Sequence, residues 1–337
     1  MAHYASKRFT YAGQLGILLA FCAFGLIIGG FLSFLPLLGK IQFSDLMGKD
    51  AQAIIEKLMI PQNAGIFRFM QLLSTVFLFC LPTLAYTKLC HNNTLKHLGF
   101  NQSVNIKQIG IVILIMLASL PLVGALQEIT TLFPWPKAML ADFKAAEVAY
   151  NKQVSVIARM NGIGDLLISL IMIALLPAVF EELFFRGGFQ NLFTRWFKNP
   201  FIAILVTSII FSAVHGSYLG FLSRAALGFV LGWMYYRTGN IWLNIIAHFT
   251  NNALAIIALY ISTKPGELTD PSKIDDHFPI WTGLIGIVAL VALFKIFEKV
   301  NQPQIVDPGK EILLQSKNDA DWPFTPTNPN ATSHPTT

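Results

Sequence analysis

The sequence predicts an all-α fold, a polytopic transmembrane helical bundle of about eight spans. Of its 337 residues, 54% are hydrophobic and only 12% are charged, whereas soluble domains carry roughly 25% charged residues. Nearly uncharged stretches of about 20 residues, enough to cross about 30 Å of hydrocarbon, recur along the chain. These two observations together predict an integral membrane protein whose main surroundings are membrane lipid.

Eight stretches are candidate spans. They lie at approximately 14–38, 67–87, 108–133, 163–185, 200–218, 219–236, 240–262 and 279–298. The first has no charge from Phe9 to Gly39, which is longer than the apolar region of a signal peptide, so we interpret it as an uncleaved span. Proline inside three of these runs, at Pro82, Pro121 and Pro177, is expected to kink the helices.

The loops predict which way the chain is inserted. Two predicted spans precede the loop around 88–107, and four precede the loop around 186–199. Both loops therefore lie on the same side of the membrane as segment 1–13. Those loops contain Lys88, Lys96, Lys107, Arg195 and Lys198 and no aspartate or glutamate. Because cytoplasmic loops are enriched in lysine and arginine, we expect a cytoplasmic N-terminus in the plasma (inner) membrane.

The polar parts of the chain are expected to play smaller roles. The N-terminal transmembrane part, 14–160, ends in segment 138–160, which is too polar to span. Its apolar residues recur every three or four positions, which predicts an amphipathic helix on the outer surface or packed across neighbouring spans; they are Met139, Phe143, Ala146, Tyr150, Val154 and Ile157.

After the last span, 279–298, the polar, proline-rich stretch 300–337 predicts a disordered tail. The net charge of +6 comes from scattered residues, so no nucleic-acid partner is expected.

Ionisable residues inside the spans are the strongest functional signal. Each costs roughly 2.5–3.5 kcal/mol in the bilayer, so such residues are usually functional. Glu182 and Arg186 are four residues apart and share one helix face, whereas Glu181 points about 100° away. We therefore assign Glu182 and Arg186 to shaping the site and Glu181 to reacting, because a partly desolvated carboxylate is a better general base. The alternative is a salt bridge that only sets helix packing.

Two histidines follow on the next apolar runs. His215 ends one run, and Asn244, His248 and Asn252 form a polar stripe on another, which lipid cannot satisfy. His248 and Asn252 can donate hydrogen bonds to developing negative charge, while Asn244 is expected to support packing. Such a set can activate water for amide hydrolysis without a serine or cysteine nucleophile.

Metal binding is the competing chemistry. Glu181, His215 and His248 could hold a divalent metal such as zinc with one position open for water. The sequence has no H-E-x-x-H stretch, so such a site would have to form between separate helices. Both possibilities remain open: no cofactor, or a divalent metal.

Three motifs carry a resemblance to a known family. E-E-x-x-x-R stands at 181–186, F-x-x-x-H at 211–215 and H-x-x-x-N at 248–252. In this order on successive spans they resemble the CPBP family of intramembrane proteases (CAAX prenyl protease and bacteriocin-processing proteins, also called Abi). The resemblance implies that 163–262 is the catalytic core.

The resemblance implies an intramembrane endopeptidase, of glutamate or metalloprotease type. It implies that Glu181 and His215 activate water, that His248 and Asn252 form the oxyanion hole, and that Glu182 and Arg186 shape the site. Its substrate would be a membrane-associated or lipidated peptide or protein; the family's best-known activity removes the last three residues of prenylated CAAX proteins.

Two other functions stay open. One is a non-catalytic membrane scaffold or bacteriocin-immunity protein that keeps these residues as a packing network. The other is a proton-coupled transporter, which would usually show repeated halves; residues 1–160 contain no counterpart of the polar set at 181–252.

Overall fold

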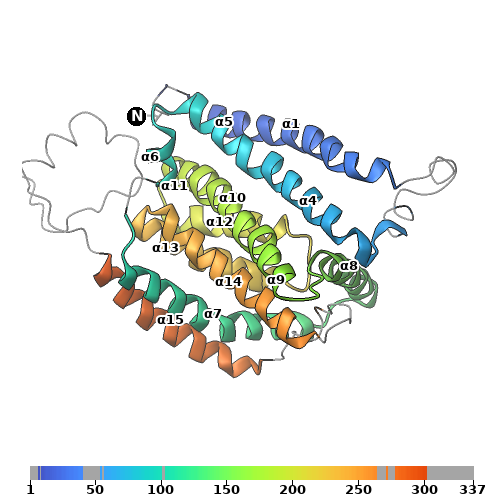
Figure 1. Ribbon diagram of the computed structural model, residues 1–337. Helices are drawn as coiled ribbons and strands as arrows, with labels where there is room; N and C mark the ends of the chain where they lie inside the picture. The colour runs from blue at the N-terminus through green and yellow to red at the C-terminus, as the bar shows by residue number, and fades with distance from the viewer. Residues whose placement is uncertain are drawn as a thin grey trace, which may run out of the picture.

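The computed structural model describes residues 7, 9–40, 54, 57–100, 103–263, 271 and 278–301. All regular elements in these ranges are helical (Figure 1), which confirms the all-α prediction. The predicted disordered tail lies outside the described residues from 302 onward. In chain order the α-helices are α1 (Tyr11–Leu38), α4 (Ala64–Thr75), α5 (Leu81–Cys90), α6 (Thr94–Leu98), α7 (Ile106–Leu132), α8 (Lys137–Ile157), α9 (Ile163–Ser169), α10 (Leu176–Glu182), α11 (Asn191–Phe197), α12 (Pro200–Ala213), α13 (Phe221–Thr238), α14 (Ile241–Ser262) and α15 (Ile280–Val300).

Shorter turns join some of these helices into continuous rods. η1 (Pro61–Asn63) is a 3-10 turn, whereas η2 (Val76–Cys80), η3 (Leu170–Leu175) and η4 (Leu183–Gln190) are π-helical. Two of the predicted kink prolines, Pro82 and Pro177, stand two residues after η2 and η3. A proline lacks the N–H that an α-turn needs, and a wider local turn accommodates that loss. Pro121 lies inside α7, which stays α-helical throughout.

Within the described residues, six helical rods are long and apolar enough to cross a membrane, which confirms a polytopic bundle. They are Tyr11–Leu38, Ala64–Cys90, Ile106–Leu132, Ile163–Phe197, Ile241–Ser262 and Ile280–Val300. Helices α12 and α13 occupy the two remaining predicted spans.

The predicted span at 200–218 is shorter than expected. Helix α12 ends at Ala213 after 14 residues, which is about 21 Å at 1.5 Å per residue and less than the hydrocarbon thickness. The chain then turns through Gly216, whose φ of 68° lies in the left-handed region that glycine tolerates. Irregular backbone at membrane depth is stable only within protein or beside a water-filled cavity. The turn that carries His215 is half exposed: Val214 and Tyr218 lie at the surface, whereas Ser217 is buried.

The predicted span at 219–236 appears as α13, which has 18 residues. Gly228 and Gly232 bring it close to α12 and η4: a Cβ at Gly228 would lie 3.2 Å from Ser208, and one at Gly232 would lie 2.8 Å from Ile204. Helix α13 also carries two arginines, so it is less apolar than the six rods. It packs as an inner helix beside α12.

The basic ends of several helices gather at one end of the bundle. The Lys7 N–H donates to the Cys90 carbonyl over 3.1 Å, and the rings of Tyr11 and Trp196 stack at 6.1 Å between centroids. The start of α1 and the ends of α5 and α11 therefore lie together. Figure 1 shows this end at the left, near the label N, and α8 at the right.

The start of α7, the start of α14 and the end of α15 lie at the same end of the bundle. The Ile241 N–H donates to Gly99 over 3.2 Å, and the Gln108 amide donates to Asn301 over 2.7 Å. Gly99 has a φ of 86°, and a Cβ there would lie 2.4 Å from the Gly239 carbonyl. This glycine lets the loop before α7 touch the start of α14.

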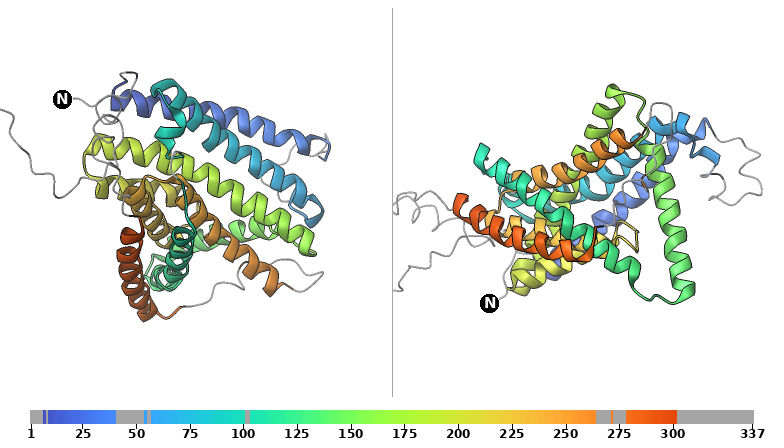
Figure 2. Two further views of the ribbon diagram at one scale, coloured as in Figure 1. Left: turned by 60° about the vertical axis from the view of Figure 1, so that its left-hand side comes forward. Right: turned by 90° about the horizontal axis from the view of Figure 1, so that it is seen from below.

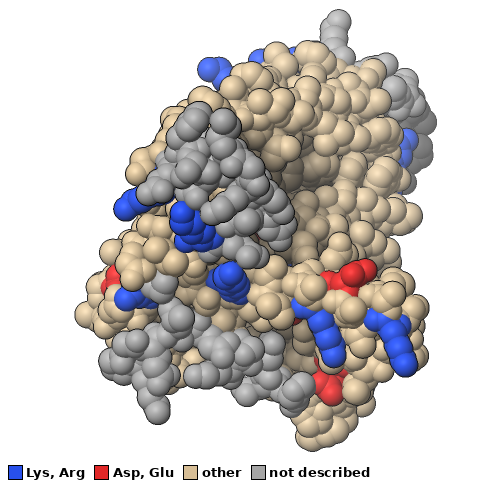
Figure 3. All heavy atoms as spheres, turned by 90° about the vertical axis from the view of Figure 1, so that its right-hand side faces the viewer, with Lys and Arg blue, Asp and Glu red and all other residues tan. Residues whose placement is uncertain are grey.

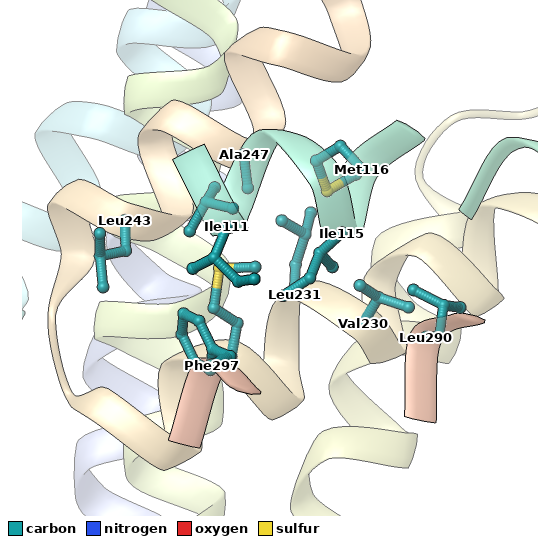
Figure 4. Packing of buried hydrophobic residues seen from close by; sticks show 11 residues of the cluster. Ile111, Ile115, Met116, Val230, Leu231, Leu243, Ala247, Leu290 and Phe297 are labelled. Atoms are coloured by element: carbon teal, nitrogen blue, oxygen red, sulfur yellow. The ribbon is translucent and has the colours of Figure 1, made fainter. Parts of the chain in front are cut away.

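A hydrophobic cluster behind α14 fixes the side of that helix away from the polar stripe. Figure 4 shows side chains from α7, α13, α14 and α15 meeting there. Its buried members are Ile111, Val112, Ile115, Met116, Val230, Leu231, Met234, Leu243, Ala247, Leu290 and Phe297. Because Leu243 and Ala247 immediately precede Asn244 and His248, their burial orients the polar residues toward α10.

Helix α8 stands out from the bundle at the end opposite the basic residues, as the right-hand view of Figure 2 shows. Of its predicted apolar face, Ile157 is buried, while Met139 is exposed. The middle of that face packs on the turn after α12, because the Phe143 and Tyr218 rings stack at 4.7 Å. Figure 3 shows this end: a few charged side chains lie on an otherwise uncharged surface, which is hollowed beside them.

Candidate active site

The two adjacent glutamates lie at the last two residues of α10, directly before η4. Glu182 is completely buried, and its carboxylate pairs with Arg186 Nε at 3.1 Å. It also accepts hydrogen bonds from His248 Nδ1 at 2.9 Å and from Asn244 Nδ2 at 3.1 Å. Arg186 in turn donates from Nη2 to the Gly228 carbonyl over 3.3 Å. Glu182 thus joins α10 to η4 and α14, and Arg186 extends the network to α13.

Glu181 points to a different part of the site. Its Oε2 lies 3.8 Å from Nε2 of His215 and 3.8 Å from Nε2 of His248. This oxygen is buried and has no hydrogen-bond partner among the described residues. The Glu181 side chain is 12% exposed and that of His215 is 26% exposed, so this part of the site is less enclosed than Glu182.

The other ring nitrogen of each histidine is held by an acceptor. His215 Nδ1 lies 2.7 Å from the Phe211 carbonyl, and His248 Nδ1 lies 2.9 Å from the Glu182 carboxylate. Carbonyl and carboxylate oxygens only accept, so both Nδ1 atoms donate. In the neutral form of each ring, Nε2 is therefore an acceptor that faces Glu181. His248 becomes a donor at Nε2 only as an imidazolium, and Glu182 stabilises that charge.

Phe211 lies at the centre of the site. Its ring centroid is 4.7 Å from that of His215 and 5.8 Å from that of His248. The Arg186 guanidinium lies over the same ring at 5.5 Å, a cation–π contact. The aromatic residue of the F-x-x-x-H motif therefore contacts the arginine and both histidines.

Asn252 and Asn244 make hydrogen bonds that differ from their predicted roles. The Asn252 amide donates weakly to the Ala174 carbonyl at 3.5 Å, and Asn251 donates to Asn252 Oδ1 at 3.4 Å. Asn244, which we expected only to support packing, binds Glu182 and also donates to the Leu231 carbonyl at 2.8 Å. Its position one turn before His248 was a signal for that role.

The predicted metal candidates do not form a recognisable metal centre. Within the described ranges, no group of three or more His, Cys, Asp or Glu side chains is arranged to hold a metal ion. His248 Nδ1 is engaged by Glu182, and the two Nε2 atoms approach a single oxygen of Glu181. The donor set as it stands does not fit a metal, so no step is routed through one.

The sequence from α9 to the middle of α14 matches a known family. Residues 163–254 match the model of the type II CAAX prenyl endopeptidase Rce1-like family. This segment is similar to that family. The match confirms the resemblance suggested by the three motifs, and the Rce1-like segment contains all of their residues. It supports an intramembrane protease-type function in an integral membrane protein.

Relatives cover different shares of the chain. An uncharacterized 24.3 kDa protein of Escherichia coli is 26% identical over 153 residues, 42% of this chain and 70% of that protein. Putative membrane peptidase YdiL of Bacillus subtilis is 34% identical over 89 residues, 26% of this chain and 36% of YdiL. The uncharacterized protein YpbD of the same organism is 36% identical over 89 residues, 25% of this chain and 42% of YpbD. No solved structure matches the chain.

Proposed function

We propose that the protein is an intramembrane endopeptidase that hydrolyses a peptide bond of a membrane-associated or lipidated substrate. One observation carries the proposal: a buried carboxylate oxygen of Glu181 lies 3.8 Å from Nε2 of both His215 and His248. The Rce1-like match and the peptidase name of YdiL support the same reaction class.

In the proposed reaction Glu181 is the general base. It takes one proton from water, while the other O–H of that water donates to His215 Nε2. The hydroxide oxygen forms a bond to the carbonyl carbon, and the carbonyl electrons move to oxygen. When the tetrahedral intermediate collapses, the C–N bond breaks and Glu181 returns its proton to the amine. General base catalysis of this kind contributes roughly 10²–10⁴-fold.

His248 and Asn252 are proposed to stabilise the oxyanion. His248 serves as its imidazolium, because its Nδ1 already donates to Glu182 and only a protonated Nε2 can donate as well. Asn252 offers its amide N–H, now bonded only weakly to Ala174. One preorganised oxyanion donor is worth roughly 10²–10³-fold in rate.

The test compares purified wild type and Glu181→Gln in liposomes containing a library of membrane-anchored peptides. Glu298→Gln is a matched control, since Glu298 pairs with Arg237 on the surface. We expect Glu181→Gln to lose at least about 100-fold in cleavage, with the control unchanged. A wild type that cleaves nothing across a broad library contradicts the proposal and favours the scaffold or immunity function. Cleavage that stops on chelation and returns with zinc replaces the glutamate mechanism with a metal-dependent one.

We further propose that the basic end of the bundle faces the cytoplasm. Lys7 donates from Nζ to the Lys88 carbonyl at 2.8 Å, which supports placing the N-terminus beside a lysine-bearing loop end. The turn carrying His215 and helix α8 then lie toward the outer side.

A further inference from the structure

Helix α8 contacts the turn that carries His215 through a buried hydroxyl. Ser217, two residues after His215, is buried, and its Oγ donates to Oε2 of Glu147 on α8 at 2.9 Å. The same Oγ accepts a hydrogen bond from the Gly220 N–H at 3.1 Å. Ser217 therefore joins two parts of the turn to each other and also binds the turn to a carboxylate on another helix.

Backbone hydrogen bonds hold this turn only loosely. The N–H groups of His215 and Gly216 donate over 3.3 and 3.2 Å, which is longer than the usual length of about 2.9–3.0 Å. Val214 and Tyr218 lie at the surface, so packing adds little at these two positions. The contacts with α8 are therefore expected to determine where the turn lies.

Helix α8 is anchored on both sides of Glu147, so it can hold what it contacts. At its C-terminal end, Arg68 on α4 donates from Nε to the carbonyl of the buried Ile157 at 2.8 Å. One turn before Glu147, the Phe143 ring stacks on Tyr218 at 4.7 Å between centroids. The Glu147 carboxylate thus has a defined position against the turn.

The bond between Glu147 and Ser217 reaches the candidate active site from outside the matched segment. Helix α8 (Lys137–Ile157) ends before residues 163–254, which match the Rce1-like family. The turn that it holds places His215 Nε2 at 3.8 Å from Oε2 of Glu181. A misplacement of about 1 Å in a reacting group can cost about 100-fold in rate, so the position of this turn matters for the chemistry.

We propose that Glu147 is a positioning residue that, through Ser217, holds His215 where it activates water with Glu181, an inference that rests on the proposed protease function. A hydrogen bond to an ionised acceptor is roughly twice as strong as one between neutral groups, which suits a carboxylate to this role. Glu147 acts on the turn and does not contact the substrate. The working site then extends to α8.

The first test measures kcat and KM in liposomes on a membrane-anchored peptide that wild type cleaves. We expect Glu147→Ala and Ser217→Ala to lower kcat by roughly 10- to 100-fold. KM should stay nearly unchanged, because the lost interaction acts on a reacting group in the transition state. Glu147→Gln, which keeps an acceptor oxygen, should retain most of the activity.

Asp142→Asn is the matched control. Asp142 is an exposed carboxylate on the same helix, five positions before Glu147, so it points about 140° away around the helix. We expect its kcat to equal that of wild type. A loss in Asp142→Asn as large as that in Glu147→Ala, or no loss in Glu147→Ala, overturns the proposal.

The double variant Glu147→Ala with Ser217→Ala tests whether the effect passes through Ser217. We expect it to be no slower than Ser217→Ala alone, because the losses of two residues in one hydrogen bond are not additive. Losses that multiply show that Glu147 acts by another route and overturn the proposal.

The reactivity of His215 separates this proposal from the protease function. Diethyl pyrocarbonate modifies neutral imidazole, and mass spectrometry of the His215 peptide gives the rate without any substrate. We expect faster modification of His215 in Glu147→Ala than in wild type or Asp142→Asn, with no change at the buried His248. This result supports the positioning role even if wild type cleaves no peptide, in which case only the protease function fails. Equal rates at His215, or a matching increase at His248, overturn the positioning role, whatever wild type cleaves.

Discussion

Glu181 and Glu182 are neighbours in the chain, yet their carboxylates have different surroundings. Glu182 is enclosed by Arg186, His248 and Asn244, while Glu181 faces two imidazole Nε2 atoms and its side chain is partly exposed. The motif spacing and helix geometry predicted this division. They could not predict Asn244 as a Glu182 partner, because that bond depends on the rotation of α14 against α10.

Replacing each glutamate by glutamine should therefore affect a different property: stability at Glu182 and cleavage at Glu181. Removing the charge of Glu182 leaves the Arg186 guanidinium buried without its ion-pair partner, which costs roughly 3–5 kcal/mol. We expect Glu182→Gln to lower the midpoint of thermal unfolding in detergent markedly, and Glu181→Gln to leave it nearly unchanged while abolishing cleavage. Equal stability of the two variants would contradict the structural role of Glu182.

Two histidines at the basic end predict how stability depends on pH. The His91 and His97 rings stack at 3.6 Å. Burial, and then the charges of Arg195 and Lys7, lower the pKa of His91 from 6.5 to about 3. Burial, with His91 and Arg195 nearby, lowers the pKa of His97 well below 6.5.

The unfolded chain therefore binds protons below pH 6.5 while the folded chain does not. Stability is greatest above that pH and falls by up to about 1.4 kcal/mol per pH unit for each histidine as the pH decreases. Thermal unfolding between pH 7.5 and 5 measures this slope, and His91→Gln should flatten it. A slope unchanged in that variant would rule out His91 as a source.

At the scale of elements, α1 packs closely against the π-helical turn η2. A Cβ at Gly25 would lie 1.9 Å from the Phe77 carbonyl oxygen, whereas one at Gly30 would meet nothing within 4 Å. Hydropathy predicted both rods, but it could not predict the π-turn. The composition of an apolar helix does not indicate whether its hydrogen bonds are α-helical or π-helical. Hydropathy also extended α12 to residue 218, since 214–218 is uncharged and Gly216 was the only sign of a turn.

Gly25→Ala and Gly30→Ala form a matched pair. We expect Gly25→Ala to push α1 away from η2 and lower stability by roughly 1–3 kcal/mol, as overpacking does. Gly30→Ala should be neutral or stabilising, because alanine is the better helix former by about 1 kcal/mol. Denaturation in detergent compares them; similar losses in both would show that the packing of α1 on η2 contributes little.

For the whole molecule, the structure separates a basic end from an end that carries α8 and the turn after His215. The loop lysines predicted the basic end, and contacts such as Lys7 with Lys88 bring those residues together. The position of α8 against that turn could not be predicted, because an amphipathic pattern shows which face is apolar and not what it covers.

Orientation in the membrane can be tested with Lys107→Cys and Lys144→Cys, made singly after replacing Cys22, Cys80 and Cys90. Both lysines are exposed, at opposite ends of the bundle. We expect a membrane-impermeant thiol reagent to label Lys144→Cys in intact cells and Lys107→Cys only after permeabilisation. The reverse pattern would place the N-terminus outside.

The π-helical turn η4 follows Glu182 directly and ends at Gln190. A π-turn and an α-turn differ by one residue per hydrogen-bonded ring, so an insertion or deletion within 187–190 can be absorbed by exchanging one ring type for the other. The glutamates before it and Asn191 after it would keep their places. Helix α14 is α-helical from Ile241 to Ser262, and a deletion between His248 and Asn252 would rotate one about 100° from the other. Gaps between relatives are therefore expected in η4 and not in this part of α14.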